Sequence, residues 1–385
     1  MAAALTILLV FAVWHLSQGP VSLAFLTPYV EDILATSHKS FRLKLDDTIL
    51  TWGGWNRAFD IRVINARAMT PDGVVMAQIP EMSMSLSTNA MVRGLLAPET
   101  IELFRPSLYL IRRQDGTFAL GFEQKEGPST ELVARIFSEL VSSPDPDNAM
   151  SYLSRVNIIK AGLTIEDQQF NSSWHSSSAD IKLVRNKRGI KGEASLDLFV
   201  DGKQTQFTIL GDYHAKDKRL DFGVAFNDLR PSIFSRVTPE FSPLEMLNLS
   251  LKGTVTVSMI IDGTLEMVGF DISGGQGRIS FPNPVAQNFE VKDAQLSGRY
   301  EGSSDTLEIV NLSLNLGENG SLLLPAPIDH RFPVKSIKTS ASYSPRRKRL
   351  EIKSFEAGLP GPKASLRAIA EGIGGDVSIN VGVDL

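Results

Sequence analysis

A 43-residue repeat constrains this chain more than any other feature of its sequence. The segment from Phe281 to Leu323 aligns without a gap with the segment from Leu324 to Leu366. The two copies share a tyrosine and an apolar–acidic–apolar triplet, which are Tyr300 with Leu307-Glu308-Ile309 and Tyr343 with Leu350-Glu351-Ile352. A more distant copy carries Tyr213 and Leu220 at the same spacing of seven residues. Such repeats are typical of arrays in which each unit packs only against its neighbours.

Apolar and polar residues alternate with period 2 from Phe41 onward. In the longest run, every second residue from Leu247 to Ile261 is apolar, with Gly253 as the one exception. Strict alternation predicts half-buried β-strands. Dipeptides such as Asp115-Gly116 and Asp262-Gly263 separate the runs and accept the positive φ of type I′ turns. Because such short turns cannot link parallel strands, we expect antiparallel hairpins.

Both aligned copies contain the same break in this alternation. Leu307 and Ile309 give way to Leu312, while Leu350 and Ile352 give way to Phe355. One extra residue at the same place in each copy predicts a shared β-bulge. At common strand lengths, each repeat holds about four strands. We therefore predict a mainly β fold, a long, coiled antiparallel β-sheet that forms a groove from repeats of about 43 residues.

Two segments favour helix over strand. The stretch from Ser129 to Leu140 places apolar residues on one helical face, and Ser129 or Thr130 can cap it. A second short helix is expected from Asp147 to Val156. Together they form a predicted helical insertion that packs over an end of the sheet.

The N-terminus carries an uncharged apolar run from Ala2 to Trp14. As a helix, this run covers roughly 20 Å, less than the hydrocarbon core of about 30 Å. Three interpretations remain open: a transmembrane anchor, a cleaved signal peptide and a buried soluble helix. Trp14 follows the run at a position suited to a membrane interface, so we expect an N-terminal transmembrane helix.

Composition excludes several classes of function. A net charge of −4 disfavours a nucleic-acid partner, which requires a basic surface. The chain has no cysteine and only five histidines, none of them close together in sequence. Neither a nucleophile motif nor a metal-ligand pattern is present. We therefore expect no catalytic residue, no metal site and no cofactor, and a protein that is not an enzyme.

The apolar face that this alternation predicts for the sheet has two interpretations. It can form an ordinary packed core, or it can line a channel for acyl chains. Alternation alone does not separate the two. The candidate lining residues are Leu220, Phe222, Val224, Phe226, Val255, Val257, Met259, Ile261, Leu312, Leu314 and Leu316.

The densest basic cluster of the chain is Arg346-Arg347-Lys348-Arg349. The repeat aligns it with Ser303-Ser304-Asp305-Thr306 and with Lys216-Asp217-Lys218-Arg219, which predicts a hairpin loop. Such a loop is either simply solvated or in contact with anionic lipid headgroups.

A series of short motifs occurs in an order that resembles a known family. The motifs are Leu26-Thr27-Pro28-Tyr29-Val30-Glu31, Ile79-Pro80-Glu81, Gly94 to Leu103, Arg105-Pro106, Gly277-Arg278-Ile279-Ser280-Phe281-Pro282 and Leu324-Pro325 to Phe332-Pro333. In this order they resemble the AsmA-like family, in particular its YhdP-like branch from Gram-negative bacteria. That family is similar in architecture to the bridge-like lipid transfer proteins.

The resemblance implies a protein anchored in the inner membrane by one helix, with most of the chain in the periplasm. It further implies phospholipid transport between inner and outer membrane in support of outer-membrane integrity. The alternative is a non-enzymatic envelope assembly or scaffold factor that binds partner proteins through sheet edges.

The expected organisation has four parts. A membrane anchor occupies residues 1–26, an N-terminal AsmA-like β region 27–128, the helical insertion 129–157 and the repeated β-groove 158–385. Alternation runs from Val377 to Leu385, the last residue. We therefore expect a terminal strand whose free edge pairs with further β-strands, either in a continuation of the groove or in envelope proteins.

Overall fold

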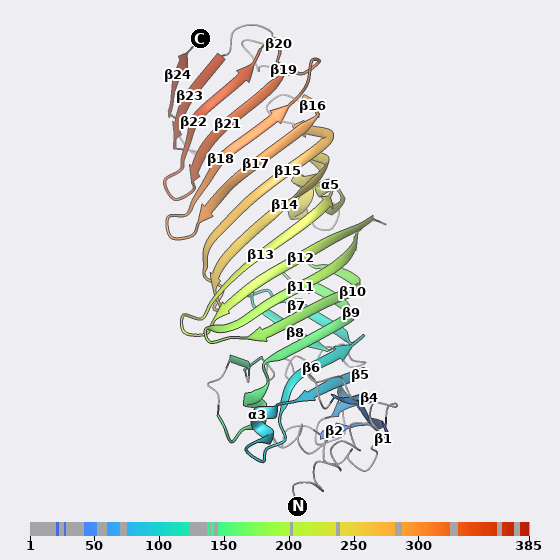
Figure 1. The fold of residues 1–385 in the computed structure, drawn as a ribbon. Coiled ribbons are helices and arrows are strands. Elements are labelled where there is room, and N and C mark those ends of the chain that lie inside the picture. Colours follow the sequence, from blue (N-terminus) through green and yellow to red (C-terminus); the bar gives the residue numbers. More distant parts are fainter. Residues whose placement is uncertain are drawn as a thin grey trace, which may run out of the picture. The chain divides into compact units, whose positions relative to one another are not determined.

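The computed structural model describes most of the chain (Figure 1). The described residues are 21–22, 27, 42–51, 60–69, 75–122, 137–138, 140–141, 145–200, 203–235, 239–281, 287–323, 330–359, 364–372 and 378–384. They form two compact units, one of Met1–Asp197 with Asp212–Lys216 and one of Leu198–Gly211 with Asp217–Leu385. The division between them runs through two strands, β11 (Gly189–Val200) and β12 (Lys203–His214).

The first unit consists mainly of strands, as predicted. They are β1 (Val21–Ser22), β2 (Arg42–Lys44), β3 (Asp47–Thr51), β4 (Asp60–Met69), β5 (Val75–Leu86), β6 (Pro98–Phe104), β7 (Ser107–Arg112), β8 (Phe118–Phe122), β9 (Arg155–Asp167) and β10 (Ser172–Arg185). Short helices accompany them, among them α3 (Thr88–Met91) and the 3₁₀ helix η2 (Ala149–Tyr152).

The sheet of the first unit is mixed, which corrects the expectation of purely antiparallel strands. β3, β4, β5 and β6 pair antiparallel in sequence order, but β6 and β7 both pair in parallel with β9. Two residues separate β6 from β7: Arg105, whose φ is +54°, and Pro106. The parallel pairing is possible because the connection from β8 to β9 carries the helical insertion, and parallel strands need such a long connection.

The predicted helical insertion is confirmed in part. Residues 137–138 and 140–141 are helical, and the Leu140 side chain is buried; the rest of Ser129–Leu140 lies outside the described residues. The second helix is shorter than predicted, because η2 ends at Tyr152 and Val156 already belongs to β9. The Asn148 side chain caps η2 by accepting a hydrogen bond of 3.0 Å from the Met150 backbone N–H.

The Ala2–Trp14 run also lies outside the described residues. Among the residues that the structure does describe, no helix is long and apolar enough to cross a membrane.

The second half of β5 is buried on both faces, whereas alternation predicted a half-buried strand. Met82 and Met84 are buried on one face, and Ser83 and Ser85 on the other. The Ser83 hydroxyl donates a 2.5 Å hydrogen bond to Asp60 Oδ1, which offsets the cost of burying it.

The second unit contains the strands that follow β12 and two short helices. The strands are β13 (Arg219–Leu229), β14 (Leu247–Ile260), β15 (Leu265–Phe281), β16 (Gln287–Val291), β17 (Asp293–Glu301), β18 (Thr306–Asn315), β19 (Ser321–Leu323), β20 (Arg331–Pro333), β21 (Ser336–Ser344), β22 (Arg349–Gly358), β23 (Ala364–Glu371) and β24 (Ser378–Asp384). The helices α5 (Pro231–Phe234) and η3 (Pro239–Met246) lie between β13 and β14.

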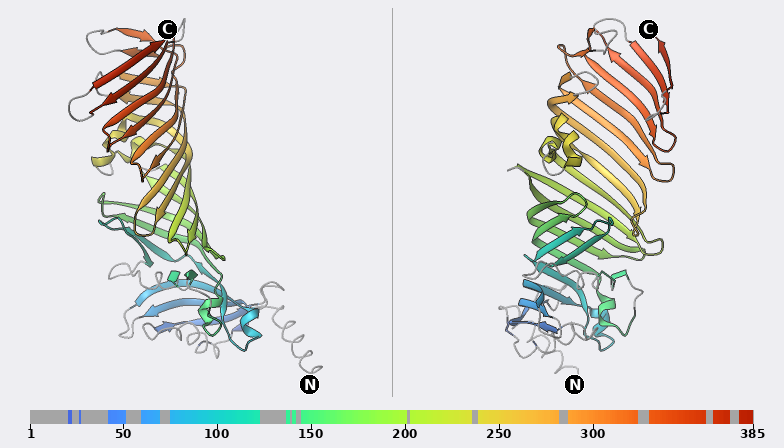
Figure 2. Two further views of the ribbon diagram at one scale, coloured as in Figure 1. Left: turned by 90° about the vertical axis from the view of Figure 1, so that its left-hand side faces the viewer. Right: turned by 180° about the vertical axis from the view of Figure 1, so that it is seen from behind.

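These strands stack side by side with a progressive twist (Figure 2). The antiparallel order is β13, β14, β15, β17, β18, β21, β22, β23, β24, with β16 pairing beside β17 on the same edge of β15. β19 and β20 pair separately. β24 therefore lies in the sheet as expected, and no strand among the described residues pairs with its outer edge.

The 43-residue repeat is confirmed by the strand bounds, since β17 and β18 recur at this offset as β21 and β22. Backbone hydrogen bonds of 2.8 Å recur with them, from Lys292 N–H to the Asn315 carbonyl and from Lys335 N–H to the Gly358 carbonyl. The hairpin turns before β13, β18 and β22 also share one conformation. Each has its last residue at φ near +50°, and these residues are Lys218, Asp305 and Lys348.

The predicted bulge is also confirmed. The register shifts between Ile309 and Leu312 in β18, and between Ile352 and Phe355 in β22. Val310 and Lys353 therefore occupy equivalent places in the two copies.

The Asp-Gly hairpins differ from the predicted type I′ turns. At Asp262-Gly263 only the glycine has a positive φ, +94°, and the Asp262 carboxylate accepts a hydrogen bond from the Thr264 N–H. Asp115, Gly116 and Thr117 repeat this arrangement. The turns are thus one residue longer than predicted, because the aspartate side chain stabilises a type I turn followed by a left-handed glycine.

One end of the second unit is closed by a packed cluster. Its buried residues are Leu249, Ile279, Phe289, Val291, Leu314, Leu316, Val334, Ile337 and Ala357. They come from the strand ends opposite the turns at 302–305 and 345–348.

We expect Leu314→Ala to lower the free energy of unfolding of the second unit by about 2–5 kcal/mol, because it leaves a cavity in this cluster. Val310→Ala is the matched control on the same strand; its side chain is 57% exposed, and we expect a change within about 0.5 kcal/mol. Urea denaturation together with hydrogen exchange of β18 peptides measures both. Equal effects of the two substitutions would contradict the packing described here.

Candidate functional site

Strand pairing brings the apolar residues of the second unit into rows that run across the sheet. The first row contains Phe222, Val257, Val268, Tyr300, Leu307, Tyr343 and Leu350. The second contains Val224, Val255, Phe270, Ile309, Ala341 and Ile352, with Gly298 between Phe270 and Ile309. Directly paired residues project from the same face of a sheet, so both rows lie on one face.

Two further rows continue this face toward the packed cluster. One contains Phe226, Gly253, Ile272, Leu296, Leu312, Thr339, Phe355 and Leu366. The other contains Leu251, Gly274, Ala294, Leu314, Ile337 and Ala357. We call the first three rows, from Phe222, Val224 and Phe226 onward, the apolar rows.

The candidate lining residues divide into three groups. Those that are half-buried on this face are Leu220, Phe222, Val224, Phe226, Val255, Val257, Met259 and Leu312. Leu314 and Leu316 are buried, at 8% and 5% exposure, in the packed cluster. Ile261 is 53% exposed in the turn after β14, so the structure corrects its assignment to the strand.

The half-buried state of the apolar rows distinguishes them from a closed core. Side chains of a solid core reach the low exposures seen in the packed cluster, whereas the described residues of the apolar rows remain in partial contact with solvent. In the third row, Leu312 and Phe355 pack against the cluster, so the first two rows are the ones that lie away from it. The face is therefore closed at one end of the strands and open toward the hairpin turns.

Sequence reasoning missed the contribution of β15 and β17 to this face. Val268, Phe270 and Ile272 alternate within β15 and complete three rows, and Leu296 and Tyr300 continue two of them in β17. Their period-2 spacing was the available signal. Gly269 lies within this stretch and Gly274 follows it, so the run of alternating apolar residues is short.

The opposite face is polar and held by ion pairs. Glu308 lies opposite Arg299 in the register and forms an ion pair of 2.7 Å with it. The bulge residue Lys353 reaches the same carboxylate at 2.5 Å. The hydrogen bond and charge of Lys353, assisted by Arg299, lower the pKa of Glu308.

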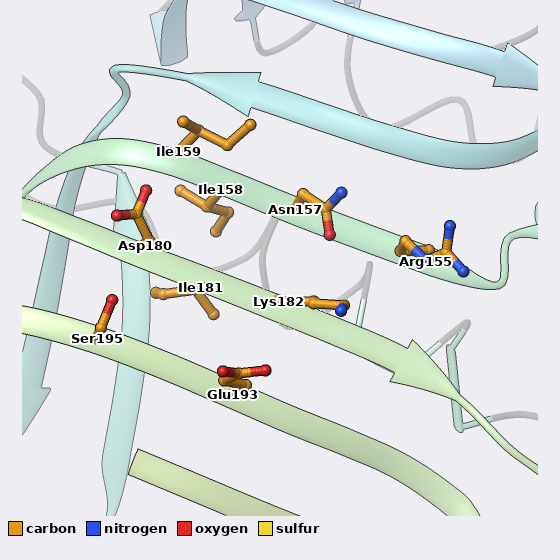
Figure 3. Close-up of a pocket in the computed structure, with 9 residues that line it drawn as sticks. All are labelled: Arg155, Asn157, Ile158, Ile159, Asp180, Ile181, Lys182, Glu193 and Ser195. Carbon is orange, nitrogen blue, oxygen red and sulfur yellow. The ribbon is translucent and has the colours of Figure 1, made fainter. Parts of the chain in front are cut away.

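Open cavities are found over the described strands of both units. In the first unit, an open cavity of about 620 Å³ is lined by side chains of β9, β10 and β11, including Arg155, Asn157, Lys182 and Glu193 (Figure 3). In the second unit, a cavity of about 320 Å³ is lined by Phe222 and Val257 of the first apolar row together with polar-face residues such as Thr256 and Ser258. A cavity of about 920 Å³ in the same unit is lined by residues that include Arg278, Glu290 and Lys292. Within the described part of the chain, no group of three or more histidine or acidic residues is placed to hold a metal ion.

We expect Lys353→Met to raise the pKa of Glu308 toward its ordinary value, measured by NMR titration of its carboxyl group. Because the folded-state pKa is lowered, Glu308 stabilises the fold above its unfolded pKa of about 4.3, and this contribution is lost as the pH falls through the folded-state value. Lys338→Met, on the same face, should leave the titration of Glu308 unchanged. An unaltered Glu308 pKa in Lys353→Met would contradict this ion pair.

Comparison with known proteins adds no identification. No protein-family model, no curated protein and no solved structure matches this chain.

Proposed function

We propose that this chain is a non-enzymatic β-groove protein that carries phospholipid with its acyl chains against the apolar rows. The observation that supports this function best is a registered apolar face whose side chains stay half-buried over three rows. Apolar surface left in contact with water is unfavourable, and extended apolar patches commonly mark binding surfaces. Acyl chains match such a face in chemistry and in shape.

The size of the apolar effect favours long acyl chains over small apolar ligands. Each methylene group removed from water contributes up to about 0.8 kcal/mol. Association costs on the order of 4–15 kcal/mol in lost translational and rotational freedom. A ligand must therefore bury about five to twenty methylene groups to offset this cost, which is within reach of a two-chain phospholipid.

The proposed cellular setting rests on the resemblance to the AsmA-like family. In this proposal, residues 1–26 anchor the chain in the inner membrane and the β units lie in the periplasm. The groove then carries phospholipid between inner and outer membrane and supports outer-membrane integrity.

A second candidate function is an envelope assembly or scaffold factor that acts through sheet edges. One observation favours it: within the described residues, the outer edge of β24 pairs with no other strand. Free edge strands are templates for added strands. Under this alternative, the purified protein binds envelope proteins and carries no lipid.

We expect Val257→Asp to abolish lipid co-purification while the protein stays folded. Val257 lies in the open part of the apolar rows, so the carboxylate is partly solvated in the empty protein but would be desolvated beneath an acyl chain. Thr256→Asp is the matched control, because Thr256 is exposed on the opposite face of the same strand. The measurements are thermal melting by circular dichroism and mass spectrometry of bound lipid.

Three outcomes of this experiment count against the proposal. Full lipid retention in folded Val257→Asp would exclude an acyl path over Val257. Unfolding of Val257→Asp alone would indicate a closed core in place of an open groove. A wild-type protein that carries no lipid would favour the scaffold function.

A further inference from the structure

The turn of residues 345–348, here called the basic turn, borders the apolar rows directly. It connects β21 to β22, whose last pair before the turn is Ser344 with Arg349. The next pair inward is Tyr343 with Leu350, which belongs to the first apolar row. Side chains of the basic turn therefore stand at the rim of the face, next to its outermost row.

The basic turn carries positive charge that no ion pair among the described residues neutralises. Arg346 lies 3.7 Å from the Asp305 carboxylate, and Arg349, just after the turn, pairs with Glu351 and Glu371 at 3.4 and 3.2 Å. Arg347 and Lys348 are exposed and form no ion pair with any other described residue. Two cations thus remain available beside an apolar surface.

The repeat shows that these cations are not required by the turn itself. Equivalent turns contain Ser304 and Asp305, or Asp217 and Lys218, where the basic turn has Arg347 and Lys348. The left-handed residue is Lys218, Asp305 or Lys348 with φ of 50°, 49° or 48°. One backbone conformation therefore accepts acidic, neutral and basic side chains, and the charge of the basic turn is free to serve a ligand.

We infer that the basic turn binds the phosphate of an anionic phospholipid whose acyl chains lie on the adjoining apolar rows. This inference rests on the proposed function and adds the class of headgroup. An amphiphile with its chains on the first row has its headgroup at the strand ends, where Arg347 and Lys348 lie. Guanidinium and ammonium groups form charge-assisted hydrogen bonds with phosphate oxygens, and an anionic headgroup has no cation of its own to oppose them.

The test uses the full chain purified in mild detergent from cells that contain both anionic and zwitterionic phospholipids. The variant is Arg347→Ser/Lys348→Asp, which installs the residues of the equivalent turn at Ser304 and Asp305. The control, Lys187→Ser/Arg188→Asp, makes the same charge change in an exposed turn of the first unit. Mass spectrometry gives the ratio of anionic to zwitterionic lipid and the total lipid per protein.

We expect bound lipid of the wild type and of the control to be enriched in anionic species relative to the membrane. In the variant, the ratio of anionic to zwitterionic lipid should fall at least about fivefold, the factor associated with one basic residue at an anionic surface. Total lipid per protein should change little, because the apolar rows are intact.

The outcomes separate this inference from the proposed function. Bound lipid without anionic enrichment, or enrichment that survives in the variant, overturns the inference alone. Absence of bound lipid from the wild type overturns both. In a further arm, lipid-free protein is melted with and without inorganic phosphate. A phosphate-dependent rise in Tm that the variant lacks would assign the turn to free phosphate and also overturn the inference.

Discussion

The register of strand pairing is the constraint on which the rest of this structure depends. Phe222 pairs with Val257 and Val257 with Val268, so a row exists only while each strand keeps its place. A slip by one residue would move a whole strand's apolar side chains to the polar face. The bulges at Val310 and Lys353 serve this register, because each returns the following apolar residues to the same face. The cross-strand pair of Arg299 with Glu308 favours the same alignment from the polar side.

The second unit combines stability and an open surface by separating them along the strands. Leu314, Val334 and Ile337 lie in the packed cluster at one strand end, where burial stabilises the sheet. Val255 and Val257 lie nearer the other end and stay half-buried. A sheet closed along its whole length would gain more apolar burial but would leave no surface for a ligand. The half-buried rows are the surface on which the proposed function relies.

The sequence predicted the elements that depend on local pattern. The 43-residue repeat follows from the gapless alignment of its two copies. The shared bulge after Ile309 and Ile352 and the common face of Phe222 and Val257 follow from period-2 alternation. It did not predict the parallel pairing of β6 and β7 with β9, because that contact joins segments far apart in the chain. The turn type at Asp262 was also missed, since a side-chain hydrogen bond to Thr264 decides it. The different exposures of Val257 and Leu314 depend on what packs above each residue, which alternation does not contain.

The repeat also determines where selectivity between ligands can arise. Within the rows, equivalent positions carry similar residues, such as Leu307 and Leu350 or Ile309 and Ile352, so under the proposed function an acyl chain would meet nearly the same surface in each copy. The turns keep one backbone conformation but vary from Ser304-Asp305 to Arg347-Lys348. Apolar contacts do not distinguish one headgroup from another, whereas charge at the rim does. In the function proposed here, the rows would supply affinity for acyl chains, and the turns would be the positions at which the chain discriminates between phospholipids.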